Sequence, residues 1–323
     1  MKITLGQPYS FCQKGRRGNQ EDARYPDNDR PPALTRTFVV CDGVGGLERG
    51  EVASRTVADA IGTYMQRVDC SQEFTPAELT LVLDRAFRAL NRLMDEDTRE
   101  MATTLTFLCV NGGGVMAAHI GDSRIYQVRP KTGILYQSED HSLVNSLVHS
   151  GVITPQEAID HPRKNVITRC IGYVAPGEER PTATTMLIND VEPGDYFFMC
   201  TDGVLDKVSD KMLIDILSSP ESDEWKINEL ARLSENSSDN NTAYLIRVDS
   251  VADDEAGESV SPETEETAES ADIAEESHDT EKIPLEGDRN RRSPEEVEEI
   301  PTSASSSSSL KSKIGSFFKK LFS

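Results

Sequence analysis

Four aspartates stand where a chain presents a carboxylate instead of packing it away. Two of them follow apolar runs, at residues 38–41 and 196–200, and each is followed directly by glycine. The other two lie in short polar turns, and the set is Asp42, Asp122, Asp202 and Asp239. One Asp-Gly turn is ordinary, but the repeated placement predicts a site built from separate parts of the chain. Oxygen ligands suit hard cations such as Mg²⁺ or Mn²⁺, and the sequence has no Cys or His spacing suited to zinc.

A pair of such cations about 4 Å apart would bind a phosphoryl group and lower the pKa of a bridging water, giving hydroxide at neutral pH. The phosphoryl oxygens would also need a cationic partner with two parallel donors. Arg17 lies in a dense polar cluster, residues 16–22, that can supply it. Taken alone, this cluster is better interpreted as a solvated loop.

The elements that must position these residues follow from hydrophobic periodicity. Short β-branched and aromatic runs predict strands at 38–41, 103–110, 115–120, 124–128, 134–137, 184–188, 196–200 and 243–248. The four runs from 103 to 137 predict one antiparallel meander, with a glycine-rich turn at 111–114. Helical spacing predicts helices over 50–68, 79–94, 210–218 and 224–235. The polar segment 138–175, with a helix start at Thr154, is expected to cap a site.

Composition limits the function classes. The formal net charge is -22, and 19 acidic residues fall in 251–300, so the part before this segment is only moderately acidic and has no basic stripe for nucleic acid. The six cysteines form no Cys-x-x-Cys pair, and Cys41, Cys109 and Cys200 lie in apolar runs, which predicts reduced, structural thiols. No secretory signal or spanning helix is evident. We therefore expect a cytoplasmic protein.

The C-terminal region has a different composition from the rest. We expect a catalytic domain over 1–249 and a disordered acidic linker over 250–309, because the linker has too few apolar residues to form a core. Residues 310–323 place apolar side chains on one helical face and four lysines elsewhere. A helix of this length, about 21 Å, cannot span a bilayer but can lie on one. The alternatives are peripheral binding at the inner face of the membrane, a partner groove, or an unbound terminus.

Eight ordered motifs carry a family resemblance over about residues 8–249. They are 17–22 (Arg-Gly-Asn-Gln-Glu-Asp), 42–46 (Asp-Gly-Val-Gly-Gly), 103–105 (Thr-Thr-Leu), 121–124 (Gly-Asp-Ser-Arg), 140–142 (Asp-His-Ser), 167–169 (Ile-Thr-Arg), 200–203 (Cys-Thr-Asp-Gly) and 239–240 (Asp-Asn). In this order they resemble the metal-dependent protein serine/threonine phosphatases of type 2C, especially the bacterial members.

The resemblance implies an α+β fold, a four-layer α-β-β-α sandwich of two antiparallel sheets flanked by helices. It also implies two Mn²⁺ or Mg²⁺ ions and a third, weaker metal site. By position, Asp42 would bridge two metals and the Gly43 carbonyl would ligate one, Asp202 and Asp239 would hold the other, and Asp122 with Asp202 would bind the third. Arg17 would bind phosphate, and Glu21 and Asp22 would order water. Residues 138–175 would form a mobile flap beside the site.

The resemblance implies hydrolysis of phosphoserine and phosphothreonine on proteins by metal-activated hydroxide, in opposition to a Ser/Thr kinase. One departure concerns the general acid. Relatives often carry a histidine at the positions of Val44 or Leu47, and help from such an acid is typically worth 10²–10⁴-fold. His119 and His141 are candidates by chemistry only, and we expect them to be a strand residue and a turn residue. The alternative function is a phosphatase-like binding or sensor module of low activity, but the presence of all four aspartates favours an enzyme.

Overall fold

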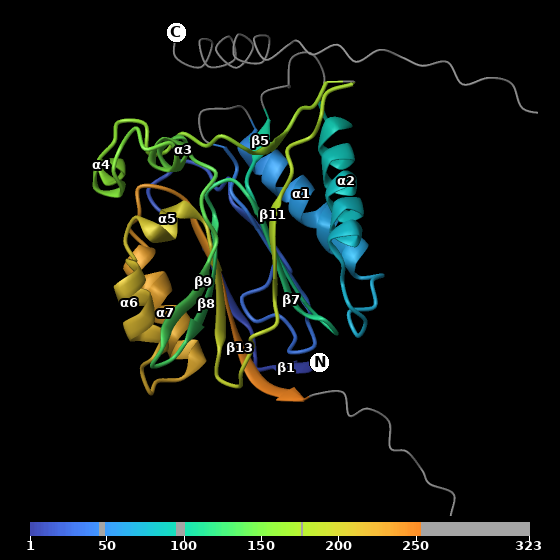
Figure 1. Ribbon diagram of the computed structural model, residues 1–323, viewed down its shortest axis with the longest axis vertical. Helices are drawn as coiled ribbons and strands as arrows, with labels where there is room; N and C mark the ends of the chain where they lie inside the picture. The colour runs from blue at the N-terminus through green and yellow to red at the C-terminus, as the bar shows by residue number, and fades with distance from the viewer. Residues whose placement is uncertain (45–48, 95–100, 176, 253–323) are drawn as a thin grey trace, which may run out of the picture. The chain divides into compact units, whose positions relative to one another are not determined.

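Two antiparallel sheets pack face to face in the computed structural model, which describes residues 1–44, 49–94, 101–175 and 177–252. Helices cover the outer face of each sheet, so the layers run helix, sheet, sheet, helix (Figure 1). This confirms the predicted α-β-β-α sandwich. The predicted linker beyond 252, the helix over 310–323 and Leu47 lie outside the described residues. In the described part of the chain, no helix is both long enough and apolar enough to cross a bilayer.

The first sheet has five strands in the order β11-β7-β6-β4-β3. They are β3 (Ala23–Tyr25), β4 (Thr37–Cys41), β6 (Leu105–Asn111), β7 (Gly114–Ile120) and β11 (Thr184–Ile188). In β4, Val39 and Cys41 pack under the helices, whereas Phe38 and Val40 pack between the sheets. Because both faces are buried, β4 reads as a continuous apolar run without polar alternation.

The second sheet is organised around one long strand. Its order is β1-β13-β12-β8-β9, with β2 also paired to β13. The strands are β1 (Lys2–Leu5), β2 (Tyr9–Gln13), β8 (Arg124–Arg129), β9 (Gly133–Gln137), β12 (Tyr196–Cys200) and β13 (Asn241–Ala252). Phe197 and Met199 face the first sheet, and Phe198 and Cys200 face the outer helices. β13 continues past the predicted end of the domain at 249, because Ile3 of β1 pairs with Val251.

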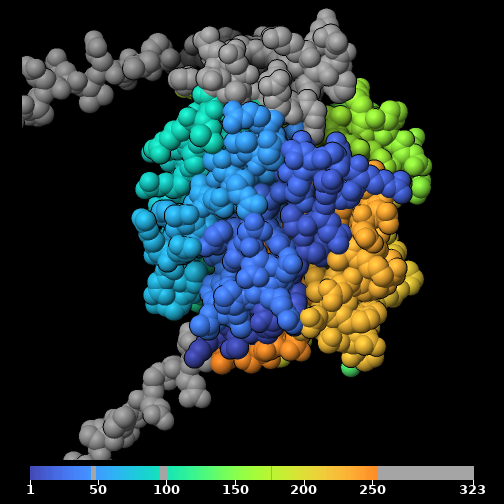
Figure 2. Space-filling model, turned by 180° about the vertical axis from the view of Figure 1, so that it is seen from behind, coloured from blue at the N-terminus to red at the C-terminus, as the bar shows by residue number. Residues whose placement is uncertain are grey.

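Helix pairs close the two outer faces. α1 (Gly50–Met65) and α2 (Pro76–Asn91) cover the first sheet, and α6 (Asp210–Leu217) and α7 (Asp223–Ser234) cover the second. The N-terminus of α2 is fixed by a capping box between Thr75 and Glu78. Figure 2 shows the N-terminal segments, in dark blue, between the side formed by α1 and α2 and the side formed by α6 and α7. The four predicted helices are confirmed.

The predicted single meander is wrong. β6 and β7 pair in the first sheet, while β8 and β9 pair in the second. The chain changes sheets at Gly121-Asp122-Ser123, where Gly121 has φ 106° and a Cβ would lie 2.7 Å from the Thr104 side chain. A side chain would be strained there, so glycine permits the crossing. Periodicity also missed β1, β2 and β3, together with the two-residue strands β5 (Ala102–Thr103) and β10 (Ile171–Gly172), which pair with each other.

The segment 138–175 forms two short helices before it reaches β10. α3 (Leu143–His149) and α4 (Pro155–Ile159) begin at the caps Ser142 and Thr154. Both helices lie at one end of the sandwich, and β1 lies at the other end (Figure 1). This placement puts the segment beside the strand ends that carry the aspartates.

Candidate metal centre and active site

Asp42 is held at the end of β4 by its own backbone. Its N–H donates to Thr104 Oγ1 at 3.0 Å, and its carbonyl accepts from Thr104 N and Thr103 Oγ1, both at 2.8 Å. These bonds use only the backbone atoms of Asp42, so they do not occupy its carboxylate. Gly43 N donates to the Glu21 carbonyl at 3.1 Å, and a Cβ on Gly43 would lie 2.6 Å from Gly50 backbone atoms. Glycine is therefore required for the β4 end to reach both the start of α1 and the loop at Glu21.

Asp202 and Asp239 are brought together by a second glycine. Asp202 opens the single turn α5 (Asp202–Leu205), directly after β12. A Cβ on Gly203 would overlap the Asn240 carbonyl and lie 3.3 Å from the Asp239 Cβ. The backbone of α5 therefore packs directly against the turn that carries Asp239.

Asn240 ties this turn to the N-terminal polar cluster. Its Nδ2 donates to the carbonyls of Lys14 at 2.8 Å and Asn19 at 2.9 Å, and its Oδ1 accepts from Glu21 N at 2.8 Å. The side chain of Asn240 is almost fully buried. The backbone of the cluster is thus tied to the site through Asn240, whereas residues 16–19 are exposed to solvent, as a solvated loop would be.

The loop of residues 16–22 brings the positively charged Arg17 and the buried acid Asp22 to the site. Arg17 Nη2 lies 2.6 Å from Asp239 Oδ2, and both side chains remain partly exposed. Asp22 is buried, and its Oδ2 accepts from Thr201 Oγ1 at 3.0 Å. Asp22 Oδ1 and Asp202 Oδ1 are buried without a hydrogen-bond partner among the described residues. Buried carboxylate oxygens with no donor are costly unless a proton or a cation compensates them.

Asp122 lies at the turn between the sheets, on the same edge. The neighbouring Ser123 hydroxyl hydrogen-bonds the Thr104 hydroxyl at 2.8 Å, which links this turn to the Asp42 backbone. Next along the chain, Arg124 holds Asp140 through two bonds of 2.7 Å. Arg124 is therefore already paired.

The aspartate carboxylates raise one another's pKa values by electrostatic repulsion. Burial raises the pKa of Asp42 well above its ordinary value, and the charges of Asp22, Asp202, Asp122 and Asp239 add to the rise. Burial also raises the pKa of Asp122 to about 8, assisted by the charge of Asp202. Burial followed by the Asp239 charge raises the pKa of Asp202 to about 6. These five aspartates therefore form one cluster, in which full ionisation of all members is energetically unfavourable.

This cluster fits divalent cations. As the side chains stand, no group of three or more acidic, His or Cys residues within the described ranges is arranged to hold an ion by itself. Arg17 currently engages Asp239, and hard cations usually retain several water ligands, so a complete protein cage is not required. The donor-free oxygens of Asp22 and Asp202 and the mutual repulsion of the acids are what a bound divalent cation would compensate.

The remaining predicted residues divide into two groups. Glu21 lies at the site, with its backbone bonded to Asn240 and its pKa raised chiefly by burial. His119 and His141 stack with ring centroids 4.5 Å apart. His119 Nε2 contacts the Glu139 carbonyl at 2.8 Å, and His141 Nδ1 accepts from Gly121 N at 3.1 Å. Burial lowers the pKa of both, so they serve as neutral structural residues.

Sequence reasoning gave no role to Thr104, Thr201 or Asn240, although each stands beside or within a motif around a predicted ligand. Their adjacency to the aspartates was the available signal. Their roles depend on hydrogen bonds to residues as much as 226 positions away in the chain, which adjacency cannot reveal.

Comparison with known proteins agrees with the fold. A model of the protein phosphatase 2C family matches residues 29–237. A putative protein phosphatase 2C-type of Streptococcus pyogenes is 34% identical over 241 residues, covering 72% of this chain and 91% of that protein. The serine/threonine protein phosphatase PstP of Mycobacterium tuberculosis is 35% identical over 213 residues, covering 64% of this chain but only 37% of PstP.

Solved structures show the same architecture. The crystal structure of M. tuberculosis PstP matches with a TM-score of 0.64 and 30% identity, covering 76% of this chain and all of that one. A PstP catalytic domain in complex with two manganese ions matches with a TM-score of 0.62 and 29% identity, covering 77% of this chain and 100% of that one. With a family model matched over most of the described residues and the aspartate cluster at the expected strand ends, the chain belongs to the protein phosphatase 2C family.

Proposed function

We propose that this chain is a metal-dependent protein serine/threonine phosphatase that hydrolyses phosphoserine and phosphothreonine and opposes a Ser/Thr kinase. The observation that carries the proposal is the cluster of five aspartates, drawn from both sheets and short of positive charge. The names of the relatives support the enzyme over a binding or sensor module.

We assign Asp42, the Gly43 carbonyl, Asp202 and Asp239 to two Mn²⁺ or Mg²⁺ ions, and Asp122 with Asp202 to a third, weaker ion. When bound, these cations would polarise the phosphoryl group and lower the pKa of water. Arg17 would exchange its bond to Asp239 for the phosphoryl oxygens, which its planar fork matches. Asp22 and Glu21 would order water by accepting hydrogen bonds from it, and the Thr201 hydroxyl donates to Asp22 and fixes its orientation.

The general acid is unassigned. Val44 stands where relatives often carry histidine, and the stacked histidines are engaged in structural contacts. Proton delivery to the departing serine or threonine oxygen therefore falls to water in this proposal.

Substrate preference is assigned to the segment with α3 and α4. A cavity of about 250 Å³ lies there, lined by residues that include Asp140, Asn145, Ser146 and Arg169. Its exposed Arg169 brings a positive charge to this cavity, where its Nη1 lies 3.3 Å from His141 Nε2. We infer that residues flanking the phosphorylated side chain bind in this cavity.

The test is release of phosphate from a phosphothreonine peptide by the full chain, with Mn²⁺ and with a chelator. We expect Mn²⁺-dependent release that is lost in Asp202→Asn. An Asp215→Asn variant, altered on the exposed face of α6, is the matched control and should retain activity. If the wild-type chain binds Mn²⁺ and the peptide but releases no phosphate, the phosphatase assignment is wrong and the sensor alternative is correct.

A further inference from the structure

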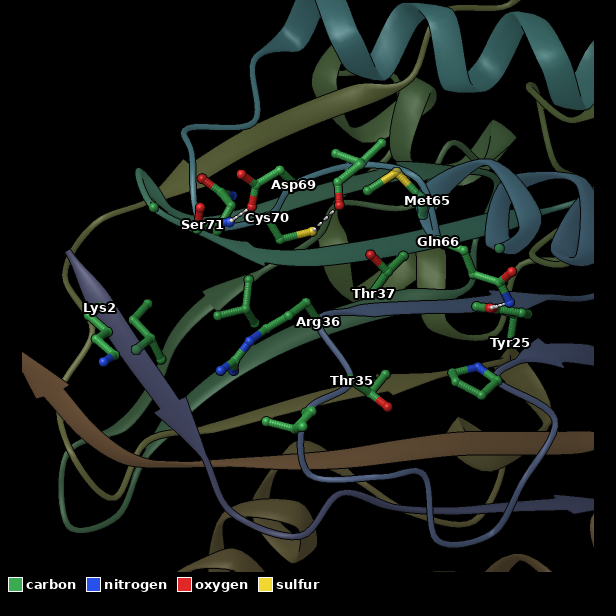
Figure 3. Close-up of a pocket in the computed structure, with 18 of the residues that line it drawn as sticks. Lys2, Tyr25, Thr35, Arg36, Thr37, Met65, Gln66, Asp69, Cys70 and Ser71 are labelled. Atoms are coloured by element: carbon green, nitrogen blue, oxygen red, sulfur yellow. Dashed lines mark hydrogen bonds between the residues drawn. The ribbon is translucent and has the colours of Figure 1, made fainter.

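A second pocket lies at the opposite end of β4 from the metal centre. Its volume is about 630 Å³, and it opens among the start of β4, the end of α1, β1 and the loop 68–71. Thr37 begins β4 here, and Asp42 follows the end of the same strand. Figure 3 shows Arg36, Thr37 and Cys70 at this pocket, with Lys2 beyond Arg36. None of these residues belongs to the aspartate cluster.

Two thiols meet at the wall of the pocket. Cys70 lies in the loop after α1, is partly exposed, and places its Sγ 3.7 Å from the Sγ of Cys109. Cys109 is fully buried in β6, directly opposite Thr37 of β4. All six cysteines lie in described residues and are free.

The surroundings make Cys70 the reactive member. The Cys109 thiol, by hydrogen bonding, lowers the pKa of Cys70, and Thr37 and the positive charge of Arg36 act in the same direction against burial. Arg36 Nη1 is buried and has no hydrogen-bond partner in the described part of the chain, so its charge is not neutralised by a close acid. In contrast, burial raises the pKa of Cys12 and Cys170, the other partly exposed cysteines. A thiolate is the nucleophilic form of cysteine.

From this geometry we propose that Cys70 and Cys109 form a reversible, hydroperoxide-sensitive dithiol pair, with Cys70 as the attacking residue and Cys109 as the resolving residue. The pocket gives a small hydroperoxide access to Cys70, while Cys109 is fully buried and does not line the pocket. The proposal does not depend on the phosphatase function, because its readout is the oxidation state of sulfur.

The chemistry balances in two steps. The Cys70 thiolate attacks one peroxide oxygen, the O–O bond breaks, and the departing oxygen takes a proton to leave as an alcohol or water. The resulting sulfenic acid is then attacked by Cys109 sulfur, so that the S–S bond forms and the S–O bond breaks. The proton of the Cys109 thiol leaves with the hydroxide as water. Two thiols are oxidised by two electrons and one hydroperoxide is reduced.

The second step needs a movement of the Cys70 loop. A disulfide has an S–S distance of about 2.05 Å, so the two sulfur atoms must approach by about 1.7 Å. β6 is fixed because it pairs with β4 on one side and β7 on the other. The loop is joined to the sheet after Cys70, where Gly112 N donates to the Gln72 carbonyl at 2.9 Å and Phe74 N donates to Asn111 Oδ1 at 3.1 Å. Cys70 itself lies in a turn outside the strand ladders, so the loop around it is the part that moves.

The experiment treats the full chain with hydrogen peroxide at up to a few equivalents, alkylates the remaining thiols after denaturation, and maps the peptides by mass. We expect a peptide cross-linked between Cys70 and Cys109, removed by dithiothreitol, before Cys12 or Cys170 is modified. In Cys70→Ser, Cys109 should remain fully alkylatable. In Cys109→Ala, Cys70 should accumulate as a sulfenic acid that dimedone traps.

Two results overturn the proposal. One is oxidation of Cys12 or Cys170 at the same rate as Cys70. The other is oxidised Cys70 in the wild-type chain with Cys109 still free to alkylate. Both results are measured on the wild-type chain, so they remain valid even if Cys109→Ala, at a fully buried position, does not fold.

Discussion

Replacing Gly43 with alanine tests whether the site depends on close backbone packing behind Asp42. The new Cβ would lie 2.6 Å from Gly50 backbone atoms and 2.7 Å from the Glu21 carbonyl. An ordinary contact needs at least 3.4 Å, so these segments must separate by about 0.8 Å. No rotamer can relieve the overlap, because the atoms on both sides belong to the backbone. The displaced segments are the ones that carry Asp42, Glu21 and the start of α1.

The expected effects follow from this displacement. A misplacement of about 1 Å can cost ~10²-fold in rate, so we expect Gly43→Ala to lower kcat/KM by roughly 30- to 100-fold. Overpacking should also lower the free energy of unfolding by about 1–3 kcal/mol. The assay is phosphopeptide hydrolysis at saturating Mn²⁺, well below the Tm of the variant, so that unfolding does not contribute to the loss.

Gly172→Ala is the matched control. Its Cβ would meet the Ala102 Cβ at 3.4 Å and the Met101 carbonyl at 3.5 Å, which are ordinary contacts. It should retain nearly wild-type activity and Tm. Wild-type kcat/KM in Gly43→Ala would refute the argument from backbone packing, and an equal loss in both variants would show that the effect is not specific to the site.

Four further predictions concern single groups. Asp202→Asn should abolish the rise in Tm that Mn²⁺ produces in the wild-type chain, measured by thermal unfolding with and without chelator. Arg17→Ala should lower kcat/KM by about 10- to 100-fold, which is the contribution of a charge-assisted hydrogen bond. The Mn²⁺ concentration for half-maximal activity should not rise, because the loss of Arg17 frees Asp239. Arg17→Lys should restore only part of the rate. Burial raises the pKa of Asp22 to about 7, so between about pH 4 and 7 the metal-free folded chain holds a proton that the unfolded chain has released. The free energy of unfolding in chelator should therefore fall as pH rises from about 4 to 7. A flat profile in urea unfolding would contradict this. Since the pKa of Cys70 is lowered, its alkylation by iodoacetamide should reach half its maximal rate at a lower pH than that of Cys12, and coincident profiles would count against the electrostatic argument.

The fold was predictable wherever burial leaves a pattern in the sequence. β4 and β12 are buried on both faces, so they read as unbroken apolar runs. The helices α1 and α2 bury one face and showed the helical period. The crossing at Gly121 was not predictable in this way, because a turn that joins neighbouring strands and a turn that changes sheets have the same local composition. β3 and β5 were too short to show any period.

The site shows a similar division. The placement of Asp42 and Asp202 after strands was visible because each carboxylate interrupts an apolar run. The three bonds of Asn240 join segments about 220 positions apart, so only the folded chain reveals that it fixes the loop of Arg17. The proximity of Cys70 and Cys109 was likewise hidden, because nothing in a separation of 39 residues distinguishes a pair that meets from one that does not.

The aspartate cluster that serves the proposed function also lowers the stability of the metal-free folded state. Its members raise one another's pKa values, so without metal the folded chain carries a repulsion that the unfolded chain avoids. Cations bound only by the folded state would add stability that grows with the logarithm of their concentration, by about 2.7 kcal/mol at 100 times Kd. The surrounding hydrogen bonds therefore have a second role besides orientation. Thr104 and Asn240 anchor the backbone beside the acids, so the repulsion cannot relax by moving the loops apart.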